Sequence, residues 1–212
     1  MNMDFMASLS NSFQELGDIF SHSDMEGFPI DRQYTKTRFP LTSNSQRRDI
    51  SNMGIWTLSS AKLGFGIQQL REDSLSAYWQ SDGSQPHTVT VYFPRKVYVS
   101  EFCIYLDFKS DESYTPSKMS ILIGNAMTDM REVQNVELEE PTGWYNFALG
   151  KLINGAYNPI KTHYVQLVIL QNQHNGRDTH IRNMKILGLR EEPVIAFPVF
   201  IENSYSKYTM MR

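Results

Sequence analysis

Hydrophobic and polar residues alternate along the central part of the chain, which is the pattern of β-strands with one buried face. The alternation begins near residue 54, and no long helical period interrupts it. It is clearest in four segments: residues 87–93, 101–108, 119–123 and 144–149. A fifth segment, residues 164–170, is almost entirely apolar and predicts a strand buried on both faces. These strands predict an all-β fold, an antiparallel sandwich.

Clusters of Gly, Pro, Asn, Asp and Ser separate the strands and predict turns. They lie at residues 81–84, 94–96, 114–117, 140–143 and 154–159. Sheets hold the bases of such loops while the tips stay in water, so function is expected on the loops.

The two ends of the chain differ from the centre. Within residues 1–20, five apolar residues follow one another at spacings of three and four, which predicts a short amphipathic helix. They are Phe5, Leu9, Phe13, Leu16 and Phe20. Such a helix can pack on the same chain, form a frayed arm, or lie in a groove of a partner. Residues 21–52 are polar without a period and predict a flexible segment. We therefore divide the chain into an N-terminal extension (1–53), a sandwich domain (54–190) and a C-terminal tail (191–212).

Composition excludes several classes of protein. The 212 residues are 41% hydrophobic, which allows one packed domain. A net charge of −3 without a long basic run argues against nucleic acid as the main partner. The single cysteine, Cys103, rules out a disulfide framework. The N-terminus lacks the basic start and apolar core of a signal peptide, and no apolar run approaches the length of a membrane span. We expect a soluble intracellular protein.

Catalytic and metal motifs are weak. His163, His174, Asp178 and His180 do not have the spacing of a zinc site. Cys103 lies within an alternating strand, where packing is the usual role of a cysteine. The sequence has no Gly-x-Ser-x-Gly motif, and its Gly-Phe-Gly stretch lacks the third glycine of a nucleotide-binding loop. We expect neither catalysis nor a metal or other cofactor.

The sequence instead favours binding of a partner molecule. Three segments are dense in hydrogen-bonding side chains: residues 79–85, 109–117 and 171–180. The last is a ten-residue run, Gln-Asn-Gln-His-Asn-Gly-Arg-Asp-Thr-His, where a plain hairpin needs two to five residues. Carboxylates, amides, hydroxyls, imidazoles and one guanidinium suit a polar, extended ligand such as a peptide or a sugar. Some of these side chains are expected instead to brace the loops.

Long motifs carry a resemblance to a known family. They include WTLSSAK-x-GFG (56–66), QLREDSLSAYWQSDGSQPH (69–87), CIYLDFKSDESYTPSK (103–118), EPTGW (140–144) and NQHNGRDTHIR (172–182). These residues closely resemble the DOC-domain subunits (subunit 10) of the anaphase-promoting complex, or cyclosome. The resemblance covers nearly all of residues 55–188 and implies a galactose-binding-like jelly roll, or DOC domain.

The resemblance also implies a function in cell division. Members of the family are non-catalytic substrate-recognition and processivity subunits of this ubiquitin ligase. With the coactivator they form a co-receptor for the destruction box of substrates such as cyclins and securin. The matching degron-binding positions are Ser81, Asp82, Gly83, Ser84, Ser110, Asp111, Glu112, Ser113, Tyr114, Asn172, His174, Asn175, Gly176, Arg177, Asp178 and His180. We expect no nucleic acid or membrane partner, and a location in the nucleus and cytoplasm.

The last residues suggest a second contact. Family members usually end in Ile-Arg, which docks in a groove of a tetratricopeptide scaffold subunit, whereas this chain ends in Met211-Arg212. Methionine keeps an apolar, adaptable side chain, so docking is still expected. The rival interpretation of the whole chain is a carbohydrate-binding module of the galactose-binding-like fold.

Overall fold

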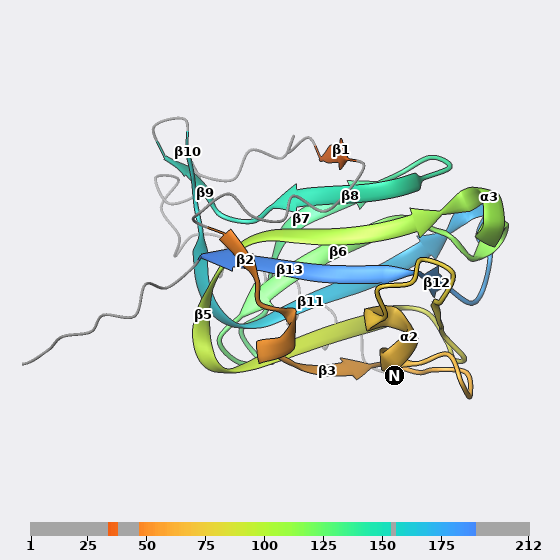
Figure 1. Ribbon diagram of the computed structural model, residues 1–212, viewed down its shortest axis with the longest axis horizontal. Helices are drawn as coiled ribbons and strands as arrows, with labels where there is room; N and C mark the ends of the chain where they lie inside the picture. Colours follow the sequence, from red (N-terminus) through yellow and green to blue (C-terminus); the bar gives the residue numbers. More distant parts are fainter. Residues whose placement is uncertain (1–33, 38–46, 154–155, 190–212) are drawn as a thin grey trace, which may run out of the picture.

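The computed structural model describes residues 34–37, 47–153 and 156–189 (Figure 1). The predicted N-terminal helix and the Met211-Arg212 end lie outside these ranges. None of the helices described here is long and apolar enough to cross a membrane.

One long strand, β5 (His87–Asp107), organises the fold because it belongs to both layers of a sandwich. Its first half pairs antiparallel with β3 (Ile55–Leu58) and β11 (Ile160–Asn172). Beyond β11 lie β6 (Pro116–Gly124) and β7 (Arg131–Glu137), which complete what we call the β11 layer. Figure 1 shows β5 turning back at one end of the molecule to cross the other layer.

The second half of β5 lies in what we call the β13 layer. There it pairs antiparallel with β8 (Thr142–Ala148) and β13 (Asn183–Leu189). Two short strands from the N-terminal part of the chain complete this layer. They are β1 (Thr35–Thr37), which pairs with β8, and β2 (Arg47–Asp49), which pairs with β13.

Short elements connect these strands. They are η1 (Ser51–Met53), α2 (Ile67–Arg71), β4 (Trp79–Gln80), α3 (Phe108–Asp111), η2 (Glu112–Tyr114), β9 (Lys151–Ile153), β10 (Ala156–Asn158), η3 (Gln173–Asn175) and β12 (His180–Ile181). Strand β4 pairs with β12, and β9 pairs with β10.

The predicted alternation accounts for the core. Val89, Val91 and Phe93 from the first half of β5 are fully buried, and so are Phe102 and Ile104 from its second half. Side chains of the two layers thus meet between the sheets, as in other sandwiches. The predicted antiparallel sandwich is confirmed.

Three local predictions were wrong. Residues 156–158 form β10 and pair with β9, although 154–159 is predicted as a turn. Residues 94–96 form no turn but continue β5 as an exposed segment. Opposite them β11 has a bulge between Thr162 and Tyr164, and bulges bend paired strands, so the sheet curls here without breaking. The segment 164–170 is buried on one face only. Val165, Leu167 and Ile169 point into the core, whereas Leu170 is 41% exposed, because the alternate side chains face away from the β13 layer.

The sheet also begins earlier than the predicted domain start at residue 54. Strands β1 and β2 precede that position, and Ile50 between β2 and η1 is only 2% exposed. Its backbone N–H donates to the Ile186 carbonyl at 2.9 Å, and the Ser51 hydroxyl accepts the Ile186 N–H at 2.9 Å. Ile50 is a single apolar residue among polar ones, so the sequence around it shows no hydrophobic period.

The burial of Ile50 gives a test of this boundary. Ile50→Ala should lower the free energy of unfolding by about 3 kcal/mol, because removing a buried aliphatic side chain leaves a cavity in the core. Denaturant unfolding followed by tryptophan fluorescence measures the change. Ile55→Ala is the matched control, since Ile55 is 56% exposed and its truncation should cost little. Equal effects of the two substitutions would contradict the assignment of Ile50 to the core.

Candidate functional site

The three polar loops meet at one end of the sandwich, beside α3 and β12 in Figure 1. This follows from the path of β5, whose two ends both lie there: His87 follows the first loop, and Asp107 precedes the second. Strand β11 ends at Asn172 beside them and leads into the third loop. Residues separated by as many as 98 positions are thus brought into hydrogen-bonding contact.

The first and third loops are joined by reciprocal hydrogen bonds. The Ser81 N–H donates to the Thr179 carbonyl at 3.1 Å, and the Thr179 N–H donates to Ser81 Oγ at 2.8 Å. Gln85 Nε2 donates to the carbonyls of Gly176 and Arg177 at 2.9 and 3.1 Å. These contacts fix the first loop against the third.

The second and third loops are joined as closely. The Gln173 N–H donates to the Thr115 carbonyl at 2.8 Å. Gly176 packs directly on the Ser113 backbone, and a side chain at position 176 would overlap the Ser113 carbonyl. Glycine is therefore required here by space. The three loops form a single connected surface.

Asn172 shapes the third loop from inside. Its Nδ2 group donates to the carbonyls of Gly176 and Asp178 at 3.1 and 2.8 Å, and the residue is 1% exposed. These bonds replace backbone pairing where β11 ends. Asn172 therefore supports the loop instead of contacting a ligand.

An ion pair anchors the second loop. Arg182 donates to Asp111 through Nε and one terminal nitrogen, both at 2.8 Å, and Nδ1 of His180 lies 3.2 Å from the same carboxylate. Burial by itself raises the pKa of Asp111, but the hydrogen bonds from His180 and Arg182 outweigh it and hold the pKa below the usual 3.8. The carboxylate is therefore ionised and committed to internal partners.

His180, which contacts Asp111, also stacks on two aromatic rings. The His180 ring lies between the rings of Tyr114 and Tyr78, with centroids 4.3 Å away on each side. Tyr78 stacks in turn on Phe65 at 5.0 Å, and the Arg182 guanidinium lies 5.6 Å from the Tyr78 centroid. Arg182 and Tyr78 were missed by the sequence reasoning. Arg182 follows His180 by two residues, and in an extended chain side chains two positions apart lie on the same face, which was the available signal.

The candidate residues thus divide by exposure. Four are buried: Ser81, Asp111, Asn172 and His180. Four are half-buried: Gly83, Ser113, Gly176 and Asp178. Eight are exposed: Asp82, Ser84, Ser110, Glu112, Tyr114, His174, Asn175 and Arg177. The buried residues hold the loops together, and the exposed ones are available to a ligand.

Several exposed residues have a left-handed backbone. The φ angles of Glu112, His174 and Asn175 are 45°, 51° and 57°. Residues other than glycine seldom adopt this conformation, and it persists where surrounding contacts impose it. The loop contacts described above supply that constraint.

A serine and a histidine approach each other within the site, yet they are not arranged for catalysis. Nε2 of His87 lies 3.3 Å from Ser81 Oγ and 2.8 Å from the Arg177 carbonyl oxygen. A carbonyl only accepts, so Nε2 carries the proton and is not a base toward Ser81. Both residues are 0% exposed, so a substrate does not reach them.

Cys103 is also unsuited to nucleophilic attack. Burial, followed by the nearby charges of Glu101 and Asp49, raises the pKa of its thiol far above the usual value. A thiolate is therefore disfavoured at this position. Cys103 is 0% exposed and packs with Trp144 and Leu187, as the sequence predicted. Within the described residues no group of three or more His, Cys, Asp or Glu side chains is placed to hold a metal ion.

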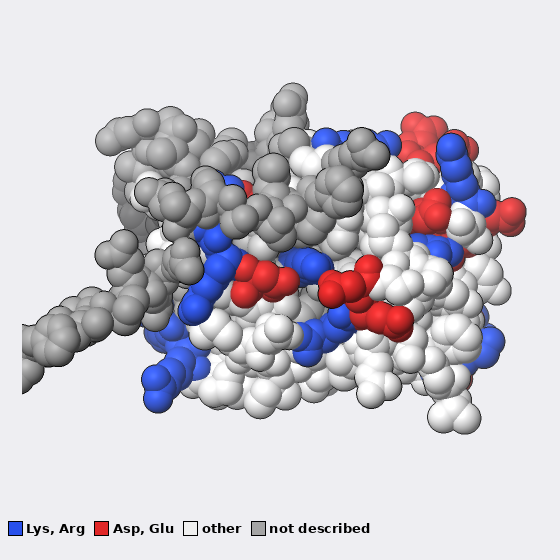
Figure 2. Space-filling view, in the orientation of Figure 1, with Lys and Arg blue, Asp and Glu red and all other residues white. Residues whose placement is uncertain are grey.

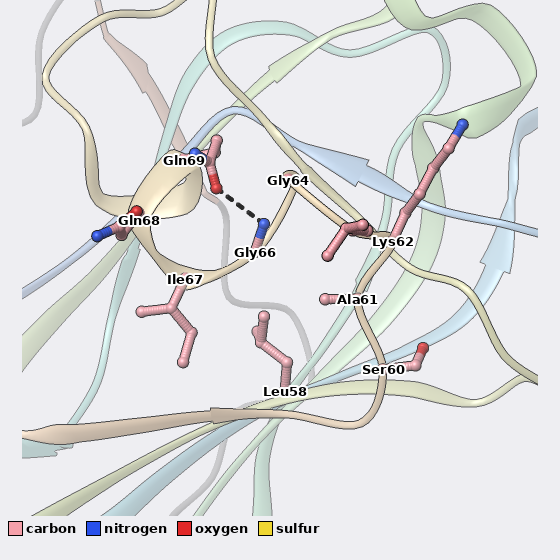
Figure 3. Close-up of a pocket in the computed structure, with 10 residues that line it drawn as sticks. Leu58, Ser60, Ala61, Lys62, Gly64, Gly66, Ile67, Gln68 and Gln69 are labelled. Carbon is pink, nitrogen blue, oxygen red and sulfur yellow. Dashed lines mark hydrogen bonds between the residues drawn. The ribbon is translucent and has the colours of Figure 1, made fainter.

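Two of the hollows beside the loops lie next to candidate residues. One, of about 550 Å³, lies beside α2, and Figure 3 shows Leu58, Ala61 and Ile67 pointing into it while Lys62 points away. Its loop contacts the candidate surface, since the Asp82 N–H donates to Ser60 Oγ at 3.1 Å. The other, of about 420 Å³, lies within the candidate surface between α3 and η3.

Comparisons of sequence identify relatives. The family model "Anaphase-promoting complex, subunit 10" matches residues 30–211. A human protein named anaphase-promoting complex subunit 10 is 46% identical over 166 residues, covering 78% of this chain and 88% of that protein. The Drosophila melanogaster protein of the same name is 38% identical over 168 residues, covering 78% of this chain and 85% of its own length. Saccharomyces cerevisiae subunit DOC1 is 30% identical over 154 residues, covering 72% and 61%.

Comparisons of structure identify the fold. The family 32 CBM from Clostridium perfringens NanJ, in complex with galactose, superposes with a TM-score of 0.55 at 13% identity, covering 66% of this chain and 98% of that one. The CBM32-1 and CBM32-2 domains of C. perfringens ZmpB, in complex with GalNAc, give a TM-score of 0.60 at 12% identity, covering 76% and 40%. The predicted galactose-binding-like jelly roll is confirmed. At such low identity the likeness concerns the fold alone.

The Asp111 ion pair predicts how stability depends on pH. Because the pKa of Asp111 is lower in the folded state, its ionised form stabilises the fold above the unfolded pKa, and this contribution is lost as the pH falls through the folded pKa. Asp111→Asn should lower the unfolding free energy by about 3 kcal/mol at neutral pH, since Arg182 and His180 lose their buried partner. The difference from the unmodified chain should shrink below pH 3.8.

Denaturant unfolding at a series of pH values measures this difference. Asp82→Asn is the control, because Asp82 is exposed on the neighbouring loop and should leave the stability unchanged. A difference that persists undiminished at the lowest pH would contradict the role of the ionised carboxylate.

Proposed function

Because the chain belongs to the anaphase-promoting complex subunit 10 family, we propose that it is a non-catalytic substrate-recognition and processivity subunit of that ubiquitin ligase. In this proposal its loop surface forms a destruction-box co-receptor with the coactivator. The substrates are proteins such as cyclins and securin, and the location is the nucleus and cytoplasm. The supporting observation is the joining of three loops into one surface whose outer side chains are free to contact a peptide.

The character of the exposed side chains fits an extended peptide. His174, Asn175 and Arg177 lie together on the third loop and offer donors and acceptors to backbone and polar groups. The rigid sandwich holds them in place before binding, so little conformational entropy is lost on binding. Their contacts are few, and the affinity of this surface alone is expected to be weak.

A weak contact becomes effective when the coactivator already holds the same peptide. The second contact is then intramolecular and multiplies the affinity by its effective concentration. The substrate dissociates more slowly and receives more ubiquitin molecules in each encounter. Catalysis by the chain itself is unnecessary, and the burial of Ser81, His87 and Cys103 is consistent with that.

The alternative function is that of a carbohydrate-binding module, since the structures with a similar fold are such modules. Sugar sites commonly include an exposed aromatic platform. Trp79 is 0% exposed, and Tyr114, although 40% exposed, has one ring face against His180. The exposed amides and charges of the third loop favour a peptide. A glycan array run in parallel with a destruction-box peptide assay separates the two functions.

The C-terminal Met211-Arg212 end is proposed to dock on a tetratricopeptide scaffold subunit of the complex. The Met211 side chain is apolar and adaptable and the Arg212 guanidinium is a strong donor, so the two residues offer complementary contacts.

The loop surface is tested by changing its exposed residues alone. A triple variant, His174→Ala, Asn175→Ala and Arg177→Ala, should speed dissociation of a destruction-box substrate from the complex about tenfold, or ~1.4 kcal/mol. Single-encounter ubiquitination by the reconstituted ligase should yield shorter chains. Asn172 is kept, because its removal would collapse the loop it supports.

The matched control carries Arg131→Ala and Asn135→Ala on β7, which are exposed but outside the candidate surface. This variant should ubiquitinate substrate at the unmodified level. Unchanged substrate dissociation in the triple variant, at normal stability and incorporation, would refute the proposed function.

The tail is tested by deletion. Removal of Met211 and Arg212 should weaken association with the scaffold subunit while leaving the unfolding free energy of the domain unchanged. Co-purification and titration with that subunit measure the effect. Replacing Met211 by Ile is the control and should preserve association. Undiminished binding after the deletion would rule out the anchor.

A further inference from the structure

A hollow of about 420 Å³ separates the second and third loops from the turn that precedes β8. Its lining consists of Phe108, Lys109, Glu112, Glu140, Thr142 and His174. Figure 2 shows acidic and basic side chains gathered at this end of the molecule, near the place where Figure 1 draws α3. Glu140 and Thr142 lie outside all three predicted ligand loops. The turn before β8 thus contributes to the candidate surface.

We propose that this hollow binds a lysine or arginine side chain of the bound destruction-box peptide, with Glu112 and Glu140 contacting its charged end. The inference rests on the proposed function and deepens it, because it assigns a chemical preference to one part of the surface.

One wall of the hollow is aromatic and firmly placed. The rings of Phe108 and His174 meet edge to face, with centroids 5.7 Å apart and planes at 75°. The Phe108 N–H donates to the Pro141 carbonyl at 2.9 Å, which fixes the start of α3 against the turn that carries Glu140. The methylene stem of a lysine or arginine packs well on such a wall while its charge stays at the rim.

Within the part of the chain that the structure describes, no cation is paired with the carboxylates at the rim. Asp111 nearby is saturated by Arg182 and His180, whereas the described residues provide no hydrogen bond or ion pair to the carboxylates of Glu112 and Glu140. Lys109 is the only Lys or Arg among the lining residues. The lining therefore carries two carboxylates and one ammonium group. A ligand cation therefore finds acceptors that the protein does not use itself.

The backbone at three lining positions is unusual. Glu112, Glu140 and His174 have φ angles of 45°, 44° and 51°, which residues other than glycine seldom adopt. Such conformations are kept where neighbouring contacts enforce them, and they are concentrated at binding sites. All three residues line the same hollow.

The test uses the reconstituted ligase with its coactivator and a series of destruction-box peptides in which each Lys or Arg is changed in turn to Gln. Glu140→Lys should weaken competition by the unmodified peptide about three- to tenfold near 0.15 M salt, where exposed charges further apart are screened. One Lys or Arg to Gln change in the peptide should weaken binding to the unmodified ligase, yet have little further effect with Glu140→Lys. A peptide with Glu at that position should bind the Glu140→Lys ligase better than the original peptide does.

Glu139→Lys is the matched control. It makes the same change of net charge at the neighbouring exposed residue, which does not line this hollow. Two results would overturn the cation site while leaving the proposed function intact. One is a peptide affinity for the ligase that no Lys or Arg to Gln change alters, and the other is an equal loss of affinity with Glu139→Lys. Failure of the proposed function appears separately, as substrate dissociation that the triple variant of the third loop leaves unchanged.

Discussion

The structure depends on one constraint, the participation of β5 in both layers of the sandwich. A strand that turns back on itself has both ends at the same edge of the molecule. The loops before and after β5 must therefore lie beside each other, although twenty-one residues of strand separate them. Strand β11 pairs with the first half of β5 and delivers the third loop to the same place. The candidate surface is a consequence of this path through the sheet.

Within that surface the polar residues have two different tasks. Asn172 and Asp111 satisfy backbone groups and charges inside the protein, and they are buried. His174, Asn175 and Arg177 are exposed, and their positions depend on the buried set. Polar groups buried with their partners hold a loop in one conformation, because breaking any bond leaves an unsatisfied group. A loop without regular pairing is thereby held in one conformation.

The sequence predicted most of the fold because alternation reports local burial. It identified the strands around Val91, Phe102 and Leu167, and the sandwich that they form. It did not identify the curl at residues 94–96, since Pro94 breaks regular pairing without ending the strand. The density of polar side chains indicated the three loops and the resemblance named their ligand positions, but neither gave the division of these residues into buried and exposed. That division depends on long-range partners such as Arg182 and Tyr78, which no local pattern reveals.

The single cysteine of the chain has a practical consequence. Cys103 lies in β5 and is fully buried against Trp144 and Leu187. Burial raises the pKa of its thiol and so keeps the thiol protonated. Maleimide reagents attack accessible thiolates, so the native chain is close to inert toward them. A second cysteine placed on an outward-facing loop therefore carries a fluorophore at a known position without removal of the first. Distances between this subunit and a labelled substrate become accessible to energy-transfer measurements in the assembled ligase.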